Sequence, residues 1–272
     1  MAEARQFASG IDFPEGPAFD SEGRLHLVAM GSGDVLRLDS VGGVEVLTHT
    51  GGKPNGLAFG PDGLLYVCDA GLQAILTVDE NNRQRTLVDE WAGGAFAGPN
   101  DLCFDPQGDF YFTDPVGSSA DNPVGRVFHC TCAGEVREVA SALAFPNGLA
   151  LSEDAHTLLV VETLTRQVWA YEVLPDGCLG RRSLFCEMRE GGVGGDGLVL
   201  DVDGNVYVAH YGLGTIDVFD AAGRALAELP AGGANPTNVA SGGMDRMDLY
   251  ITEAETGAVT VQRTLRPGLE LF

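Results

Sequence analysis

An internal repeat constrains the fold of this chain more than any other feature of its 272 residues. Each copy begins with a short polar segment, continues through an apolar run, turns at Asp, Gly or Pro residues, and ends in a second apolar run. The head of a copy is the residue after its leading Pro or Gly. Successive heads stand 40 to 49 residues apart, and a period of this size is typical of blade-like arrays. The six heads are Glu15, Asn55, Asn100, Asn147, Asp196 and Thr237.

Each repeat contains enough sequence for four short strands. In the second repeat the apolar runs and turn residues predict strands at 57–59, 64–68, 74–79 and 84–88. The sixth repeat ends after its third strand at 258–263, whereas residues 3–8 precede the first head, where a fourth strand belongs. We therefore predict an all-β fold: a single six-bladed β-propeller domain over residues 1–272, with four-stranded antiparallel blades and an N-terminal strand that completes the last blade.

The strong negative charge argues against two classes of partner. The chain has 39 acidic and 16 basic residues, and its formal net charge is −23. Such a surface repels phosphate backbones and anionic lipid, so nucleic acid and membrane partners are not expected. No run of 18 apolar residues could span a membrane, and MAEARQF lacks the basic start and apolar core of a signal peptide. We expect a cytoplasmic protein.

The six cysteines do not form a recognisable framework of disulfides or metal ligands. Cys68 and Cys103 lie in predicted strands, where buried free thiols are common. Cys130 and Cys132 form a C-x-C pair, but no second pair with zinc spacing accompanies them. We expect neither disulfides nor a site for a soft metal.

The heads predict a cation site. In a propeller the innermost strands line the central channel, so the six heads should converge at one end of it. Glu15 and Asp196 are carboxylates, whereas Asn55, Asn100 and Asn147 are carboxamides. Converging oxygen donors suit a hard divalent cation such as Ca²⁺, and two carboxylates would balance its charge. The alternative is that Asn-Gly, Glu-Gly and Asp-Gly are simply turn residues.

The ends of the second strands predict another ring of polar side chains around the same mouth. The first two strands of a blade are antiparallel, so the residue after the second strand lies beside the residue before the first. In this ring His210 would titrate near neutral pH. The alternative for each member is a structural role, as a cap of a strand end or a bond to the neighbouring blade. The ring comprises Met30, Asp69, Asp114, Glu162, His210 and Glu253.

Some of these positions are expected to face the substrate. Asn55, like Thr237, is assigned a structural or substrate-side role, because six protein ligands would leave no open position on a catalytic metal. Asp101 follows its head where other repeats have Gly. We assign Asp101, Asp114 and His210 to substrate binding together with Asn55.

The segments that carry the heads resemble a known family. FPEGPAFD, PNGLAFGPDG, PNDLCFDPQGDFYFTDP, FPNGLALSED and GDGLVLDVDGNVYVA, with PTNVASGG near the end, are similar to sequences of the gluconolactonase and senescence-marker-protein-30 (regucalcin) family. The resemblance covers essentially the whole chain. It implies a six-bladed propeller with one catalytic divalent cation, often calcium, and lactone hydrolysis as the commonest activity. Matched position by position, it implies that Glu15, Asn100, Asn147 and Asp196 are the metal ligands and that Asp196 is also the catalytic proton acceptor.

One position departs from the regucalcin pattern. Regucalcin-like members carry an Arg two residues before the Asn-Asp head, where it serves sugar substrates, and this chain has Gly98 there. The FTDP ending of the same hairpin looks more like the microbial gluconolactonase branch. The resemblance implies a sugar lactone or a related small lactone as substrate, and the departure at Gly98 argues against assigning the aldonolactone specificity of the regucalcin branch.

The residues and the resemblance together predict a metal-dependent lactonase, a carboxylic ester hydrolase that opens a lactone with metal-activated water. The expected cofactor is one divalent cation, Ca²⁺ first and Zn²⁺, Mn²⁺ or Mg²⁺ as alternatives. The protein is expected to be a monomer or a weak homo-oligomer. One alternative is a phosphotriesterase-type hydrolase on the same metal site. Another is a non-enzymatic propeller that binds a ligand or a protein, although disrupted heads would be expected there and the heads are intact.

Overall fold

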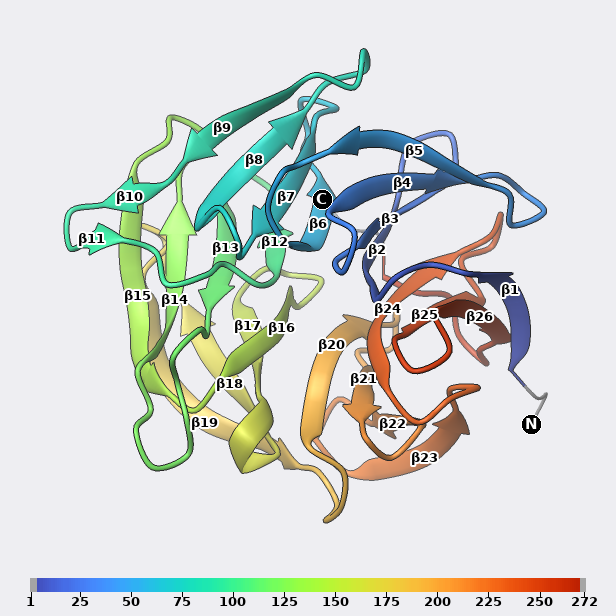
Figure 1. Ribbon diagram of the computed structural model, residues 1–272. Coiled ribbons are helices and arrows are strands. Elements are labelled where there is room, and N and C mark those ends of the chain that lie inside the picture. Colours follow the sequence, from blue (N-terminus) through green and yellow to red (C-terminus); the bar gives the residue numbers. More distant parts are fainter. Residues whose placement is uncertain (1–3, 270–272) are drawn as a thin grey trace.

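The computed structural model describes residues 4–269 and consists of six four-stranded antiparallel sheets arranged as blades around an axis (Figure 1). Within residues 4–269 the only helical segment is one 3₁₀ turn, η1 (Thr163–Thr165). The predicted all-β class and the six four-stranded blades are confirmed. No helix in this part of the chain is long and apolar enough to cross a membrane. The cytoplasmic location and the single domain over residues 1–272 stay predictions.

Each blade begins with its innermost strand and runs outward in chain order, except at the chain's ends. A short hairpin, β10 (Glu90–Trp91) and β11 (Gly94–Ala95), connects the second and third blades. The first blade consists of β2 (Pro14–Phe19), β3 (Leu25–Ala29), β4 (Asp34–Leu38) and β5 (Val44–His49). The second consists of β6 (Pro54–Phe59), β7 (Leu65–Asp69), β8 (Ala74–Val78) and β9 (Gln84–Val88). The third consists of β12 (Leu102–Phe104), β13 (Phe110–Asp114), β14 (Gly125–Cys130) and β15 (Val136–Leu143). The fourth and fifth blades are β16 (Pro146–Leu151), β17 (Thr157–Glu162), β18 (Gln167–Val173) and β19 (Leu179–Glu187); and β20 (Gly194–Leu200), β21 (Val206–Tyr211), β22 (Thr215–Phe219) and β23 (Ala225–Pro230).

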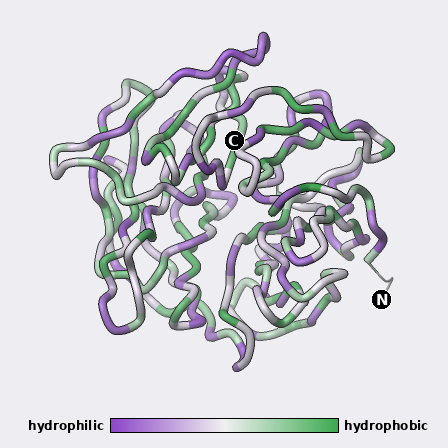
Figure 2. The backbone as a smooth tube through the Cα atoms, in the orientation of Figure 1, coloured by the Kyte–Doolittle hydropathy of each residue, from purple (hydrophilic) through white to green (hydrophobic). Residues whose placement is uncertain are grey.

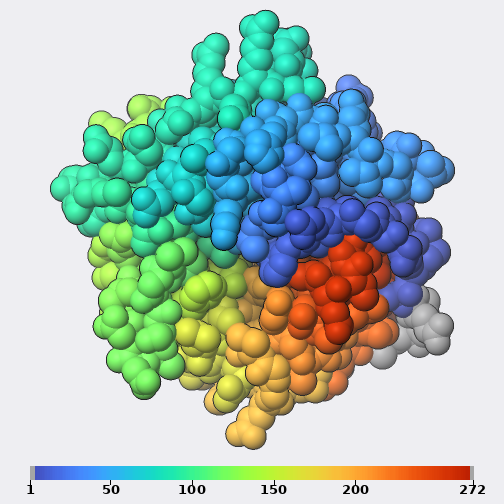
Figure 3. Space-filling view, viewed as in Figure 1, coloured from blue at the N-terminus to red at the C-terminus, as the bar shows by residue number. Residues whose placement is uncertain are grey.

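The sixth blade closes the ring with both ends of the chain, as the repeat pattern predicts. It consists of β24 (Pro236–Gly242), β25 (Asp248–Glu253), β26 (Ala258–Arg263) and, as its outermost strand, β1 (Arg5–Ser9). Strand β1 pairs antiparallel with β26. Figures 1 and 3 show the dark blue N-terminal segment against the red C-terminal strands. Residue 3, the first residue of the predicted strand, lies outside the described residues.

Six apolar clusters fill the six contacts between neighbouring blades. Between the first two blades, for example, Val28 packs in one cluster with Val67. The cluster that closes the ring joins Ala8 and Val259 to Leu27. Polar residues lie mainly in the outer loops, and Figure 2 shows the projecting loop between β8 and β9 as hydrophilic. Because burial of apolar surface fixes each blade against both neighbours, the innermost strands are held at defined positions around the axis.

Candidate active site

Five of the six heads lie inside the innermost strands, whereas Asn100 lies just before β12. Glu15, Asn55 and Asn147 are the second residues of β2, β6 and β16, and Asp196 and Thr237 lie within β20 and β24. A β-bulge lies at or directly after the head in each of these five strands. Bulges bend a strand and re-aim its side chains. The alternative interpretation of the heads as turn residues is therefore wrong for these five, and it is not tested at Asn100.

The glycines that follow the heads let neighbouring blades approach closely. A Cβ atom on Gly16 would lie 2.4 Å from the carbonyl oxygen of Asn55, the head of the next blade. Gly56, Gly148 and Gly197 meet the next blade about as closely. Glycine inside a strand often marks a place where another backbone comes near. The Gly after each of these four heads therefore allows neighbouring blades to pack closely around the channel.

The third and sixth blades break this glycine pattern, and their side chains meet in the channel. Asp101 and Asn238 occupy the position that is Gly in the other four blades. Nδ2 of Asn238 donates a hydrogen bond of 3.3 Å to Oδ2 of Asp101. The backbone N–H groups of Leu102 and Val239 donate to the remaining side-chain oxygens of the pair. Since the third and sixth blades are opposite each other in a ring of six, the pair spans the channel.

Asn238 was not predicted as a site residue. Its signal was present in the sequence, because the Gly after the head is replaced in two repeats that are three blades apart. The six heads, Asp101 and Asn238 are all buried, with at most 9% of each residue exposed.

Three buried carboxylates come together at the heads. Burial is the largest cause that raises the pKa of Glu15 well above its usual range, followed by repulsion from Asp196 and Asp101. Burial and then repulsion from Asp101 raise the pKa of Asp196 well above its usual range, although a hydrogen bond with Asn147 opposes them. Burial raises the pKa of Asp101 to about 7. The fold thus concentrates negative charge in a place with little water.

This donor set fits a divalent cation. The heads offer carboxylate, amide and hydroxyl oxygens and neither imidazole nor thiolate, which suits Ca²⁺ or Mg²⁺ better than a softer metal. A bound cation would also offset the repulsion that raises the pKa values of Glu15 and Asp196.

The structure brings three of the four predicted metal ligands together. Glu15 and Asp196 act on each other electrostatically, and Asn147 contacts Asp196. Nδ2 of Asn147 also donates a hydrogen bond of 3.3 Å to Oγ1 of Thr163. Asn100, the fourth predicted ligand, is also buried, and it directly precedes Asp101 in the sequence. The roles of all four as ligands stay predictions.

The acidic residues that end the second strands are buried at the same mouth, but backbone donors surround them. Oδ1 of Asp69 accepts hydrogen bonds of 2.7 and 2.8 Å from the N–H groups of Lys53 and Leu72, while its Oδ2 has no partner in the described part of the chain. The carboxylate of Glu253 accepts hydrogen bonds from three backbone N–H groups within residues 235–256. These residues tie the loops between blades to the strand ends.

Asp114, predicted to bind substrate, is engaged within the protein. Its carboxylate accepts hydrogen bonds from the N–H groups of Ala97 and Gly98 and forms an ion pair with Arg126. Asn55, also predicted to face substrate, has its Nδ2 3.8 Å from the sulfur of Met30. Both substrate-binding roles stay predictions.

His210 is also engaged within the protein. It is fully buried, with Nδ1 2.8 Å from a carboxylate oxygen of Asp217 and Nε2 3.1 Å from the carbonyl oxygen of Gly191. These contacts connect β21 to β22 and to the segment that leads into the head at Asp196. The predicted substrate contact of His210 is not tested by this geometry.

A cavity of about 540 Å³ lies along the other part of the channel. Asp101 and Asn238 line it, whereas none of the six heads does. Its walls are largely apolar and come from the later residues of the innermost strands, including Ala18, Leu57, Leu149, Leu198 and Val239. The cavity therefore begins beyond the Asp101–Asn238 pair and is not the candidate active site.

All six cysteines are free, as predicted. Buried thiols such as Cys68 and Cys130 lie in the apolar contact between the second and third blades.

Residues 13–255 match the family model described as SMP-30/Gluconolactonase/LRE-like region. The chain is 29% identical to a gluconolactonase of Zymomonas mobilis, in an alignment that covers 90% of this chain and 77% of that protein. It is 26% identical to a diisopropyl-fluorophosphatase of Loligo vulgaris, with 90% of this chain and 87% of that protein covered. Among solved structures, a gluconolactonase from Xanthomonas campestris superposes with a TM-score of 0.84 at 26% identity, covering 95% of this chain and 88% of that one.

Proposed function

The chain belongs to the SMP-30/gluconolactonase/LRE-like family, and on this premise we propose that it is a metal-dependent lactonase that opens a sugar lactone or a related small lactone. The observation that carries the proposal is the convergence of the buried carboxylates of Glu15, Asp101 and Asp196 at the head end of the channel. The similarity to gluconolactonases supports the reaction class.

Glu15, Asn100, Asn147 and Asp196 would hold the cation, with Ca²⁺ as the expected ion. When bound, a divalent cation supplies Lewis acidity, which polarises a carbonyl oxygen and stabilises the negative charge that develops on it. The carboxylates of Glu15 and Asp196 provide the compensating charge, and the amides of Asn100 and Asn147 provide neutral oxygens.

Asp196 is the proposed general base. Its carboxylate accepts a proton from the attacking water, whose oxygen bonds to the carbonyl carbon of the lactone. The bond from that carbon to the ring oxygen then breaks, and the ring oxygen takes up a proton, so that lactone and water give a hydroxy acid. Burial and repulsion from Asp101 raise the pKa of Asp196, which increases the affinity of its carboxylate for the proton of the attacking water. The hydrogen bond with Asn147 holds this carboxylate in place.

The proposal is tested with chelator-stripped protein and a panel of five- and six-membered lactones, to which Ca²⁺, Mg²⁺, Mn²⁺ and Zn²⁺ are added back one at a time. We expect hydrolysis that returns with metal and is lost in Glu15→Gln. Metal binding without hydrolysis of any ester would instead support a non-enzymatic binding propeller. Absence of metal binding would contradict the proposed site.

A second candidate function is phosphotriester hydrolysis, which the similarity to a diisopropyl-fluorophosphatase favours. The same cation and the same base could act on a phosphoryl centre, because both reactions develop negative charge on an oxygen bound to the attacked atom. Comparison of kcat/KM on the best lactone and on diisopropyl fluorophosphate separates the two. A higher value on the fluorophosphate would replace the lactonase proposal.

A further inference from the structure

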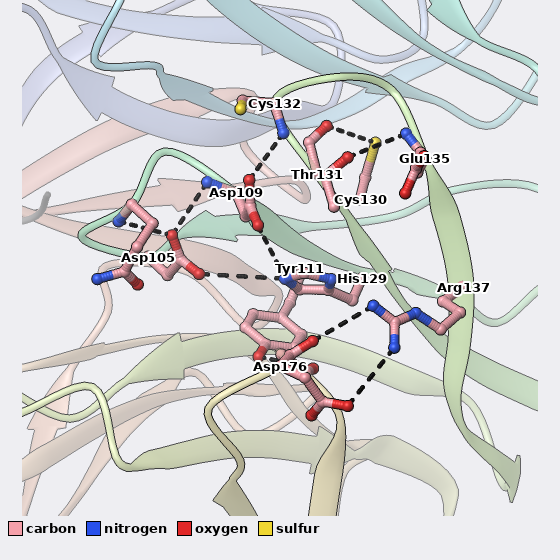
Figure 4. Close-up of polar contacts among 12 residues, drawn as sticks. Asp105, Asp109, Tyr111, His129, Cys130, Thr131, Cys132, Glu135, Arg137 and Asp176 are labelled. Atoms are coloured by element: carbon pink, nitrogen blue, oxygen red, sulfur yellow. Dashed lines mark hydrogen bonds and ion pairs between the residues drawn. The ribbon is translucent and has the colours of Figure 1, made fainter.

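A second cluster of titratable side chains lies on the third blade, in the turn between β12 and β13 and on the facing strand β14. Asp105, Asp109 and His129 each direct one donor atom toward the same point, and these atoms all lie within 4.8 Å of one another (Figure 4). Nε2 of His129 is 3.7 Å from Oδ2 of Asp109 and 4.0 Å from Oδ2 of Asp105. The candidate active site does not involve these residues.

Hydrogen bonds orient both carboxylates and leave one oxygen of each directed at the imidazole. Oδ1 of Asp105 accepts from the backbone N–H groups of Gln107 and Asp109. Oδ1 of Asp109 accepts from the backbone N–H group of Cys132. Such hydrogen bonds to metal-binding carboxylates fix the orientation of the ligands.

His129 is buried and has no hydrogen-bond partner among residues 4–269. It is 2% exposed, and neither of its ring nitrogens is within hydrogen-bonding geometry of a donor or acceptor. The ring is held by Tyr111, whose ring centroid lies 4.8 Å away, and by Gly177, on which a Cβ atom would lie 2.5 Å from the imidazole. Burial lowers the pKa of His129, so that the neutral imidazole, the form that binds metals, predominates at neutral pH.

The equivalent turns of the first and fifth blades contain a side-chain donor that the turn of the third blade lacks. In the first blade the side chain of Arg24 donates to Oδ2 of Asp20 over 2.7 Å. In the fifth blade Nδ2 of Asn205 donates to Oδ2 of Asp201 over 2.8 Å. Only the third of these turns has a second carboxylate, Asp109, in place of the donor. Its two carboxylates therefore lack the side-chain donor that stabilises the other turns.

We propose that Asp105, Asp109 and His129 form a second cation site for a divalent transition metal, Zn²⁺ foremost, on the third blade. A cation held about 2.0–2.2 Å from each donor in tetrahedral geometry separates the donor atoms by about 3.3–3.6 Å. The observed separations of 3.7 and 4.0 Å are too long for hydrogen bonds and within a few tenths of an ångström of that range.

The donor chemistry sets the class of metal. One imidazole nitrogen with two carboxylate oxygens suits Zn²⁺ and similar first-row ions, whereas Ca²⁺ takes six to eight oxygens. The nearby thiols are not donors: Cys132 is exposed, and Sγ of Cys130 contacts the carbonyl oxygen of Thr131. The bound ion would tie the β12–β13 turn to β14 and stabilise the fold by an amount that grows with the logarithm of the free metal concentration above its dissociation constant.

The test uses the tag-free full chain after chelation, and the Glu15→Gln/Asp196→Asn variant separates this site from the channel. We expect this variant to bind one equivalent of Zn²⁺ in equilibrium dialysis with elemental analysis. Adding Asp109→Asn should weaken that binding by at least about 10-fold. Asp20→Asn, at the equivalent position of Asp105 in the first blade, and Cys132→Ser should leave it unchanged.

Circular dichroism establishes the fold of each variant. If the double variant does not fold, Zn²⁺ binding to the unsubstituted chain is measured in saturating Ca²⁺, which occupies the channel site, and gives the same readout. The proposal is overturned if no Zn²⁺ binds outside the channel, or if Asp105→Asn and Asp109→Asn both bind it as tightly as their parent. The result is independent of the proposed lactonase activity, because no readout involves turnover.

Discussion

Two sets of acidic side chains lie at the head end of the channel, equally buried and in different electrostatic surroundings. Glu15 and Asp196 face other carboxylates, and their pKa values are raised by burial and repulsion. Glu253 is as buried, but hydrogen bonds from residues 235–256 outweigh burial and lower its pKa. Burial alone therefore does not identify a functional acid. In a functional acid of this kind the hydrogen bonds within the protein do not offset burial and repulsion, so that a cation or a substrate can supply the missing stabilisation.

The largest expected effect is on turnover in Asp196→Asn. Loss of a general base typically costs about 10²- to 10⁴-fold in rate, and loss of one charge should weaken metal binding as well. The unfolding free energy of the metal-free protein should not fall, because the substitution removes repulsion within the cluster. Steady-state kinetics and thermal unfolding measure the two effects. An Asp196→Asn variant with full lactonase activity would contradict the assignment.

The opposite behaviour is expected for Glu253→Ala. Removal of this carboxylate leaves three half-buried N–H groups without their acceptor, which should lower the unfolding free energy by about 1–3 kcal/mol, while kcat of the folded protein changes little. Urea unfolding and kinetics test this expectation. Glu80→Ala, an exposed acid in the loop between β8 and β9, is the control and should change stability by less than about 0.5 kcal/mol. If Glu253→Ala lowers kcat as strongly as Asp196→Asn does, the distinction between the two sets fails.

A comparable effect on stability is expected from Gly197→Ala. The added Cβ would lie 2.0 Å from Oδ1 of Asn238, and such overpacking typically costs about 1–3 kcal/mol. Asn238→Gly in the same chain removes the obstructing side chain, so the double variant should recover part of the loss. Additive destabilisation in thermal unfolding would show that the contact between the fifth and sixth blades is not what requires Gly.

The last expected effect is a pH dependence of stability in the metal-free protein. The pKa of Asp101 is raised to about 7 in the folded chain, against about 3.9 for an unfolded Asp. The folded state thus retains a proton that the unfolded chain loses, which disfavours the folded state most above pH 7. The unfolding free energy should therefore increase as the pH falls from about 8 to about 5.

The raised pKa values of Glu15 and Asp196 act in the same direction. Thermal unfolding at several pH values, with and without metal, measures the dependence, and Asp101→Asn should make it shallower. An equal pH dependence in Asp101→Asn would show that this carboxyl does not titrate as described.

Much of the fold followed from local sequence. The strands of the second repeat were predicted within three residues of their observed ends, and the largest difference is at β6, which begins at Pro54 rather than at 57. Strand propensity is low for Asn and Gly, but packing between neighbouring blades extends this strand through Asn55 and Gly56. Tertiary packing, which a propensity cannot represent, thus overrode the local preference.

The candidate site followed from the sequence less completely. The heads were identified because they recur at one phase of the repeat, and that phase places them at one end of the channel. Asn238 was missed because its role depends on a contact with Asp101, a residue 137 positions away in sequence. The acids that end the second strands were grouped with the heads as a polar ring, because their backbone donors come from loops whose conformations a repeat does not specify.

The sequence by itself determined the number of blades, the strand that closes the ring and the residues that converge on the axis, because these depend on a periodic pattern of apolar, turn and polar residues along the chain. Only the tertiary structure decided which buried acids are matched by donors and which are not. The match between buried polar groups and hydrogen-bond donors, at Glu15 and Glu253 and at His129 beside Asp105 and Asp109, depends on contacts between segments that are distant in sequence or lie in irregular loops. The free energy of a buried charge depends on every group within a few ångströms of it, and only the folded chain brings those groups together.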